Sequence, residues 1–292
     1  MVAEVTVRER ISDLVVVTDV TIEDVDSDET ALAKTAKLVE QELMRRMGLP
    51  LQFGSSSKEF HKDKKMATET KMHHLPAPHP KYWGQRYKLF SKFDDGVQMD
   101  DEGWYSVTPE AIANHHASRC ACALACDLFA GAGGDAIALA KTCGRVLAID
   151  NNHDRLGMAV HNAEVYGVSE RIDFICGDSV ALLHSIKPDV LYMSPPWGGM
   201  EYNKSGKEYS LCDINVAGID GFELLQRCLA LTPHVALFLP RNTSMEEMAA
   251  FAEEAGIPCE IEHNWVPSEK GSLRLKAITV YFGRLAQPAL GR

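Results

Sequence analysis

Four consecutive residues, Ser194, Pro195, Pro196 and Trp197, follow a short apolar run and could together hold a flat ring that carries an amine. The Ser194 hydroxyl and the Pro195 carbonyl can each accept a hydrogen bond from an N–H group, which fixes the nitrogen and returns electron density to it. Proline has a fixed φ, so the turn is rigid, and Trp197 offers a face for stacking. The pattern predicts chemistry on an exocyclic amine, with a proline-rich loop and a packing Trp as the alternative.

A glycine-rich turn, Gly131-Ala-Gly133, follows an earlier apolar run that ends at Asp127. Glycines let a ligand approach the backbone and the next helix, but a nicotinamide site or a simple tight turn would also use them. A carboxylate here would repel a pyrophosphate and attract the ammonium and sulfonium of S-adenosylmethionine. Two more predicted strands end in acids: Asp150, suited to ribose hydroxyls, and Asp178, suited to adenine or to capping a helix. These acids predict S-adenosylmethionine as the cofactor.

The composition adds no metal site and no membrane segment to this prediction. Eight cysteines include Cys120, Cys122 and Cys126 close together, but none forms a CxxC pair, so we expect small apolar side chains in a reducing compartment and no bound metal. Apolar residues make up 46% of the chain, without a run long enough to span a bilayer or to form a signal-peptide core. The net charge of −11 indicates that a nucleic-acid substrate must be recognised locally, in a pocket.

From about residue 120, apolar runs alternate with helical periodicity, which predicts an α/β fold with a doubly wound, mainly parallel sheet. The last two apolar runs are too close together for a crossover helix, so we expect them to pair antiparallel. Seven strands are predicted in all, at residues 124–130, 145–150, 171–178, 189–194, 234–240, 259–265 and 275–283.

The first 80 residues are expected to be an acidic and polar extension. Residues 1–30 should be partly disordered. A stripe from Leu32 to Met47 predicts one amphipathic helix, and residues 54–80 have the composition of a linker. We expect the chain to divide into three parts, at residues 1–80, 81–118 and 119–292.

Residues 81–284 resemble the trimethylguanosine synthase family of cap-specific guanine-N2 methyltransferases. The resemblance rests on six segments: 81–90, 93–96, 103–110, 162–167, 194–199 and 239–242. It implies a Rossmann-like class I methyltransferase domain with a small N-terminal helical subdomain, residues 81–118, that caps the active site. It also implies that the substrate is 7-methylguanosine-capped RNA, converted to N2-methylated (2,2,7-trimethylguanosine) caps.

The resemblance also assigns roles to individual residues. It implies that Ser194, Pro195 and Trp197 are catalytic and that Trp197 meets the guanine. The residues that it implies for the cofactor are Asp127, Gly131, Gly133, Asp150, Asp178 and Thr108. Arg241 is implied to contact a cap phosphate, and Asn162 and Phe93 to help bind the substrate. We expect the substrates to be small nuclear or nucleolar RNAs. The expected location is the nucleus or nucleolus, with the cytoplasm as the alternative, and the N-terminal extension is expected to bind protein partners.

Some features leave alternatives open. Where the family usually has Cys and Asn, this chain has Ala130 and Asp135, and Asp135 adds a charge beside the cofactor turn. Thr108 could be only a helix cap before Pro109, Arg241 could form a surface ion pair, and the rings of 82–93 could be core. The competing functions are methylation of another RNA base amine (a ribosomal guanine N2 or an adenine N6) and cap binding without catalysis.

Overall fold

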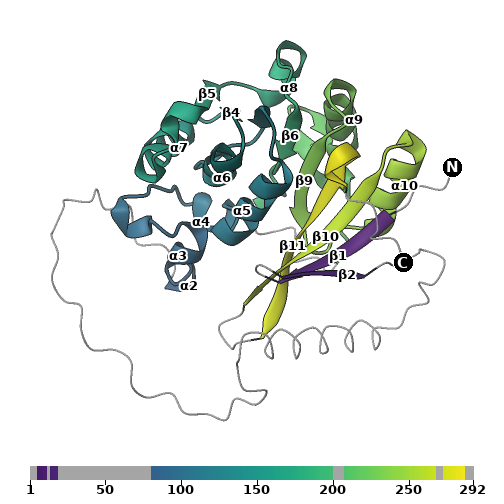
Figure 1. The fold of residues 1–292 in the computed structure, drawn as a ribbon, viewed down its shortest axis with the longest axis horizontal. Coiled ribbons are helices and arrows are strands. Elements are labelled where there is room, and N and C mark those ends of the chain that lie inside the picture. The colour runs from purple at the N-terminus through teal and green to yellow at the C-terminus, as the bar shows by residue number, and fades with distance from the viewer. Residues whose placement is uncertain (1–4, 12–13, 19–79, 200–206, 268–271, 287–292) are drawn as a thin grey trace, which may run out of the picture.

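A sheet of nine strands forms the centre of the part of the chain that the structure describes (Figure 1). This computed structural model describes residues 5–11, 14–18, 80–199, 207–267 and 272–286. The strands of the sheet are β1 (Val5–Ile11), β2 (Leu14–Thr18), β3 (Leu124–Asp127), β4 (Arg145–Asp150), β5 (Ile172–Cys176), β6 (Val190–Met193), β9 (Val235–Pro240), β10 (Cys259–Pro267) and β11 (Leu273–Phe282). They lie in the order β2-β1-β10-β11-β9-β6-β3-β4-β5.

The seven strands predicted from the sequence form one continuous block of this sheet. β5, β4, β3, β6 and β9 pair in parallel, and β11 runs antiparallel between β9 and β10. The doubly wound, mainly parallel sheet and its antiparallel final pair are therefore confirmed. The chain order reverses between β3 and β6, and ligands bind beyond the carboxyl ends of the strands at such a point.

Helices cover both faces of the sheet (Figure 1). The α-helices are α2 (Pro80–Trp83), α3 (Arg86–Leu89), α4 (Gly103–Ser106), α5 (Glu110–Arg119), α6 (Gly134–Thr142), α7 (His153–Tyr166), α8 (Ser179–Leu182), α9 (Gly221–Leu231) and α10 (Met245–Ala255). Short 3-10 turns are η2 (Phe93–Asp95), η3 (Ser169–Arg171), η4 (Leu183–Ser185), η6 (Leu211–Asp213) and η7 (Gly283–Leu285). A hairpin, β7 (Asn215–Val216) and β8 (Ile219–Asp220), lies outside the main sheet.

Two hydrophobic cores lie on opposite faces of the sheet because side chains alternate along each strand. On β6, Val190 and Tyr192 join the core beneath α5 and α6, whereas Leu191 and Met193 join the core beneath α9 and α10. β9 is buried along its whole length, as expected for a strand covered on both faces. Burial on both faces holds the ends of β3, β4 and β6 in fixed positions.

The residues before β3 form short helices, and one of their attachments to the main domain is a buried amide. Asn162 on α7 accepts from Gln98 N at 2.7 Å and donates to the carbonyl oxygens of Gln98, at 2.8 Å, and Ala132, at 2.9 Å. It therefore ties the segment before α4 to the glycine-rich turn. Phe93 is buried against Trp83 and Trp104, with ring centroids 5.5 Å away in both cases.

Two segments of residues 1–30, the part expected to be partly disordered, form strands at the edge of the sheet. β1 pairs in parallel with β10, and β2 pairs antiparallel with β1, so the sheet is extended at this edge. Both segments are rich in β-branched residues, which favour a strand despite the acidic surroundings. The predicted amphipathic helix from Leu32 to Met47, and the predicted linker up to residue 79, lie outside the described residues.

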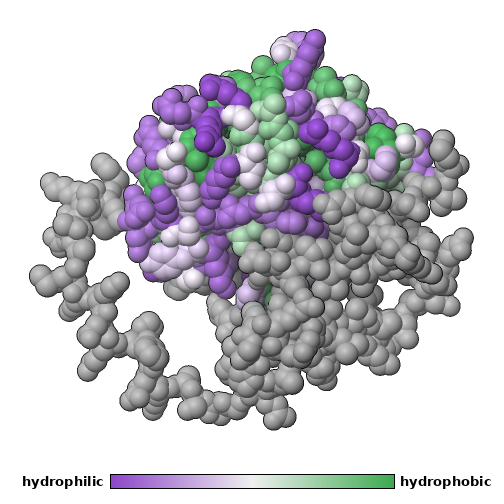
Figure 2. Space-filling model, in the orientation of Figure 1, coloured by the Kyte–Doolittle hydropathy of each residue, from purple (hydrophilic) through white to green (hydrophobic). Residues whose placement is uncertain are grey.

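The described surface is polar over much of the face in view. Figure 2 shows hydrophilic residues over the helical segment at the lower left, with hydrophobic residues gathered towards the top. Within the described ranges, the helices are all too short or too polar to span a membrane.

A buried ion network joins α5 to β10. Arg119 approaches Glu260 at 2.8 Å and Glu262 at 3.2 Å, and both carboxylates are inaccessible to solvent. Although burial opposes its charge, the hydrogen bond from His115 and the charges of His115 and Arg119 hold the pKa of Glu262 below its ordinary value. The network needs its cation, because the two carboxylates would otherwise be buried together.

We therefore expect Arg119→Met to lower the free energy of unfolding by about 3–5 kcal/mol, the usual effect of leaving buried charge uncompensated. Urea unfolding at neutral pH measures it. Arg145→Met is the matched control, because its pair with Asp173 is about half exposed and should contribute far less. Equal losses in the two variants would contradict this account of the α5–β10 contact.

Candidate active site

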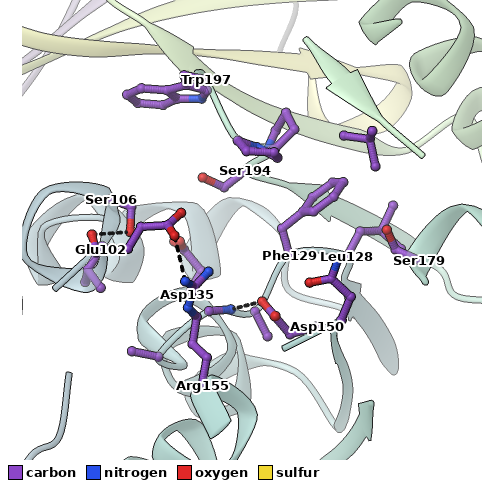
Figure 3. Close-up of a pocket in the computed structure, with 18 of the residues that line it drawn as sticks. Glu102, Ser106, Leu128, Phe129, Asp135, Asp150, Arg155, Ser179, Ser194 and Trp197 are labelled. Carbon is purple, nitrogen blue, oxygen red and sulfur yellow. Dashed lines mark hydrogen bonds and ion pairs between the residues drawn. The ribbon is translucent and has the colours of Figure 1, made fainter. Parts of the chain in front are cut away.

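A cavity of about 410 Å³ opens at the carboxyl ends of β3, β4 and β6, where the chain order reverses. In Figure 3, Ser194 and Trp197 lie on one side of it, and Asp150 and Arg155 lie on the other. The volume is within the range of cofactor pockets in proteins. The cavity thus brings the predicted amine site and the predicted cofactor site together.

Asp150 at the end of β4 holds the floor of this cavity in shape. Its Oδ2 accepts from Gly131 N at 2.8 Å, and its Oδ1 accepts from Asn152 N at 2.8 Å. Gly131 has φ of 53°, in the left-handed region that favours glycine. Each carboxylate oxygen can still accept another hydrogen bond, so Asp150 is suited to a pair of ribose hydroxyls.

Asp127 at the end of β3 lies beneath the floor and does not line the cavity. It is 1% exposed. Its Oδ1 accepts from Phe129 N at 3.2 Å, and its Oδ2 accepts no hydrogen bond from the residues that the structure describes. Burial, with repulsion from Asp135 and Asp150, raises the pKa of the Asp127 carboxyl well above its ordinary value, although the backbone N–H groups of Phe129 and Ala136 act the other way. A buried carboxylate with an unsatisfied oxygen fits a site for a cationic ligand.

Asp135 in the first turn of α6 presents a second carboxylate to the cavity. Its Oδ2 accepts from the Thr108 hydroxyl at 2.6 Å. Thr108 is buried and makes no side-chain cap to α5, whose N-cap is Pro109. Of the two alternatives for Thr108, the simple helix cap is therefore excluded by the geometry, and its hydroxyl instead fixes a charged group of the cavity wall.

The turn after β6 forms the opposite wall. Ser194, Pro195 and Trp197 line the cavity. The indole N–H of Trp197 donates to the Phe238 carbonyl at 3.2 Å, and the two ring centroids are 5.3 Å apart. These contacts fix the plane of the half-buried indole ring, so it can serve as a stacking face.

α4 closes one side of the cavity through two ion pairs. Arg155 at the start of α7 donates to Asp100 at 2.9 Å and to Glu102 at 2.6 Å. Tyr105 on α4 lines the cavity, and its pKa is raised by partial burial and by the charges of Glu102 and Asp100. The pairs hold α4 against the helix that follows the Asp150 turn.

Comparison with known proteins identifies the family. The family model described as RNA cap guanine-N2 methyltransferase matches residues 122–285. A trimethylguanosine synthase of Schizosaccharomyces pombe is 42% identical over 188 residues, which cover 61% of this chain and 77% of that protein. The chain belongs to the RNA cap guanine-N2 methyltransferase family.

A second relative agrees with this assignment, and a solved structure agrees with the fold. A trimethylguanosine synthase of Saccharomyces cerevisiae is 35% identical over 180 residues, 58% of this chain and 56% of that protein. A solved structure from Porphyromonas gingivalis W83, described as a methyltransferase, superposes with a TM-score of 0.53 at 17% identity and covers 69% of this chain and 47% of the other. The structural match concerns the fold alone, which is that of the class I methyltransferases, and the family uses S-adenosylmethionine.

The cavity contains most, but not all, of the residues predicted for the site. It is lined by seven of them: Thr108, Gly131, Asp150, Asp178, Ser194, Pro195 and Trp197. Asp178 also caps α8, because its Oδ1 accepts from Val180 N at 2.9 Å. The predicted residues that do not line it are Phe93, Asp127, Gly133, Asn162 and Arg241.

Two of these residues outside the cavity shape its walls from behind. Asn162 holds the Ala132 carbonyl, as described above. Gly133 has φ of 90°, and a Cβ there would lie 3.1 Å from the Ala159 Cβ, so glycine permits close packing of the turn on α7. Arg241 follows β9 at an exposed position. The individual roles of all these residues stay predictions.

The sequence did not identify several residues of the cavity wall. Glu102 directly precedes α4, and Tyr105 and Arg155 lie on α4 and α7. The hairpin contributes Asn215–Val216 and Ala217. Ala217 has φ of 53°, and Gly218, which follows it, has φ of 83°. The Ala217-Gly218 dipeptide was the sequence signal that could have predicted this hairpin, since two-residue hairpin turns need positive φ.

The geometry of Asp150 leads to a binding prediction. Asp150→Ala should weaken S-adenosylhomocysteine binding by about 2–4 kcal/mol, because two hydrogen bonds from ribose hydroxyls to a carboxylate would be lost. Calorimetric titration measures the dissociation constant. Asp154→Ala is the control, since its side chain is on the same turn but exposed. An unchanged dissociation constant in Asp150→Ala would remove Asp150 from the cofactor site.

The unsatisfied Asp127 carboxylate leads to a prediction that one substitution stabilises the ligand-free protein. Because its pKa is raised in the folded state, its ionisation destabilises the ligand-free fold as pH rises above the unfolded value. Asp127→Asn should therefore raise Tm without ligand, by more at pH 8 than at pH 5, while it weakens binding of the cationic cofactor. Thermal unfolding at both pH values, with and without S-adenosylmethionine, measures both effects. A variant that is less stable at pH 8 would show that the charge is already compensated.

Proposed function

We propose that the protein transfers a methyl group from S-adenosylmethionine to the guanine N2 of 7-methylguanosine-capped RNA, and that it forms 2,2,7-trimethylguanosine caps. The observation that carries the proposal is the common cavity: the Ser194–Trp197 wall faces the Asp150 wall across it. Membership in the cap guanine-N2 methyltransferase family, and the names of the two yeast relatives, support the same substrate.

The amine end of the site works by orientation. The N2 group of guanine is conjugated with its ring and is a weak nucleophile. In the proposal, the Ser194 hydroxyl and the Pro195 carbonyl each accept an N–H of this group, so its lone pair is directed into the cavity and regains electron density. S-adenosylmethionine would supply the electrophilic methyl and leave as neutral S-adenosylhomocysteine, N2 would lose one proton to solvent for each methyl gained, and no residue is needed as a covalent nucleophile.

Trp197 selects and aligns the ring in this proposal. Its indole is fixed by the hydrogen bond to Phe238 and by ring contact, so stacking on it costs little ordering. N7-methylguanine carries a delocalised positive charge, which an aromatic face attracts. The same face would therefore favour a base already methylated at N7.

The remaining predicted residues divide between cofactor and substrate. Asp150, Asp178, Gly131 and Thr108 would hold the cofactor directly, whereas Asp127 and Gly133 would support the turn beneath it. Arg241 would contact a cap phosphate, and Asn162 and Phe93 would act by holding the segment before α4 in place.

The wider biological setting extends the proposal. The capped substrates would be small nuclear and nucleolar RNAs, and the protein would act in the nucleus or nucleolus. Residues 81–118 would cap the active site of a methyltransferase domain at 119–292, whose sheet β1 and β2 extend, and the remainder of residues 1–80 would be available to protein partners. The acidic net charge supports recognition of the cap in a pocket rather than of a long phosphate backbone.

The test compares 7-methyl-GTP with GTP as methyl acceptors, with products resolved by mass. Wild type should prefer 7-methyl-GTP, and Trp197→Ala should nearly abolish transfer because stacking and N2 orientation are both lost. Trp197→Phe should keep some activity but reduce the preference for 7-methyl-GTP over GTP. One indole face favours the cationic ring by about three- to thirty-fold, and a phenyl ring binds a cation more weakly. The measured quantity is the ratio of kcat/KM for the two acceptors.

Two results would overturn this assignment. Near-normal rates in Trp197→Ala would show that the ring only packs. If GTP serves as well as 7-methyl-GTP in wild type, the cap is not the substrate, and uncapped RNA carrying a guanine or adenine amine becomes the acceptor to assay.

A further inference from the structure

A chain of buried polar groups runs from the cavity wall into the sheet. Asp135 Oδ1 lies 3.4 Å from His116 Nδ1, which is 3.1 Å from the Tyr192 hydroxyl. On its other side, His116 Nε2 is 2.8 Å from the Thr279 hydroxyl. Asp135 is in contact with the cavity, whereas His116 is completely buried behind it on α5. A histidine in this position can change the charge of the cavity wall without meeting a ligand.

The groups that face His116 come from every element packed around it. Asp135 comes from α6, Tyr192 from β6 and Thr279 from β11, and the Phe238 ring of β9 lies 5.1 Å away. Glu262 of β10 also acts electrostatically on it, but this carboxylate is paired with Arg119 and His115.

The other buried acid nearby is Asp127 of β3, which is close enough to Asp135 for the two carboxylates to repel each other. Burial raises the pKa of this carboxyl, and the hydrogen-bond partners of His116 among the described residues do not include it. Asp135 is therefore the carboxylate of the cavity wall whose charge a proton on His116 would compensate directly.

Hydrogen-bond accounting allows two charge states of this pair. When His116 is doubly protonated, Nδ1–H can donate to Asp135 and Nε2–H to Thr279, and the pair is neutral overall. When His116 carries a proton only on Nε2, Nδ1 accepts from Tyr192, and Asp135 keeps an uncompensated negative charge. The Thr108 hydroxyl donates to Asp135 at 2.6 Å and fits either state.

We infer that the Asp135–His116 pair makes the cofactor site select by charge: with His116 neutral, Asp135 favours the sulfonium of S-adenosylmethionine over the neutral sulfur of S-adenosylhomocysteine, and protonation of His116 removes that preference. Both ligands carry the same ammonium and carboxylate groups, so the contributions of those groups cancel in the comparison. His116 is thereby a positioning residue that acts through Asp135. An asparagine at position 135 could not act in this way, because it carries no charge.

The inference depends on the cofactor and not on the cap, so its test contains no RNA. Dissociation constants for S-adenosylmethionine and S-adenosylhomocysteine are measured by calorimetry on the full-length protein between about pH 5.5 and about pH 8, the range in which histidine ordinarily titrates. The ratio of the two constants should shift towards S-adenosylmethionine by about tenfold as pH rises, which equals about 1.4 kcal/mol. In two buffers of different ionisation heat, S-adenosylmethionine should release more protons on binding than S-adenosylhomocysteine at the pH where the ratio changes most steeply.

Three variants separate this mechanism from a general loss of structure. Asp135→Asn should weaken S-adenosylmethionine about tenfold, leave S-adenosylhomocysteine nearly unchanged, and make the ratio independent of pH. His116→Asn should keep the preference for S-adenosylmethionine at every pH. His115→Gln is the matched control, because His115 bonds Glu262 and not Asp135, so the pH dependence should persist.

The wild-type data alone can overturn the inference, even if a variant fails to fold. A ratio that does not change with pH, together with equal proton release for both ligands, would do so. A pH dependence that survives unchanged in a folded Asp135→Asn protein would assign the titration to another group. Neither result would bear on whether capped RNA is the methyl acceptor.

Discussion

Repulsion among three carboxylates at the carboxyl edge of the sheet is the constraint on which the rest of the site depends. Asp127 and Asp150 end neighbouring parallel strands, and Asp135 begins the helix between them. Asp135 and Asp150 both raise the free-energy cost of ionising Asp127, which is fully buried. Such crowding is unfavourable in an empty cavity and favourable around a ligand that carries positive charge, so the acids prepare the edge for the sulfonium cofactor.

The surrounding elements offset this repulsion with fixed dipoles instead of cations. Backbone N–H groups of Gly131, Asn152 and Phe129 point at the carboxylates, and the Thr108 hydroxyl donates to Asp135. The same loops therefore shape the cavity and stabilise its charge. The guanidinium of Arg155, which lines the cavity, is instead engaged by two acids that precede α4, which leaves the floor of the cavity negative.

Whether a feature could be predicted depended on how far its parts lie apart in the sequence. The seven core strands, the acids at or just after the ends of three of them, and the Ser194–Trp197 turn are local patterns, and all were predicted. The contacts of Thr108 with Asp135 and of Arg155 with Asp100 join residues that lie 27 and 55 positions apart, so no local pattern reveals them. The edge strand β1 pairs with β10 across most of the chain, and the acidic composition of residues 1–30 led to an expectation of partial disorder instead of a strand.

An acidic protein that acts on a polyanion must obtain its selectivity at short range. With a net charge of −11, the long-range field opposes the approach of RNA, and affinity cannot come from many phosphate contacts. Within the cavity the situation reverses, because a base that carries positive charge meets an indole face and a negative floor. Discrimination then depends on the few atoms around the reacting amine, which is why the rigid turn after β6 and the packed ring of Phe238 behind Trp197 matter more than any basic surface.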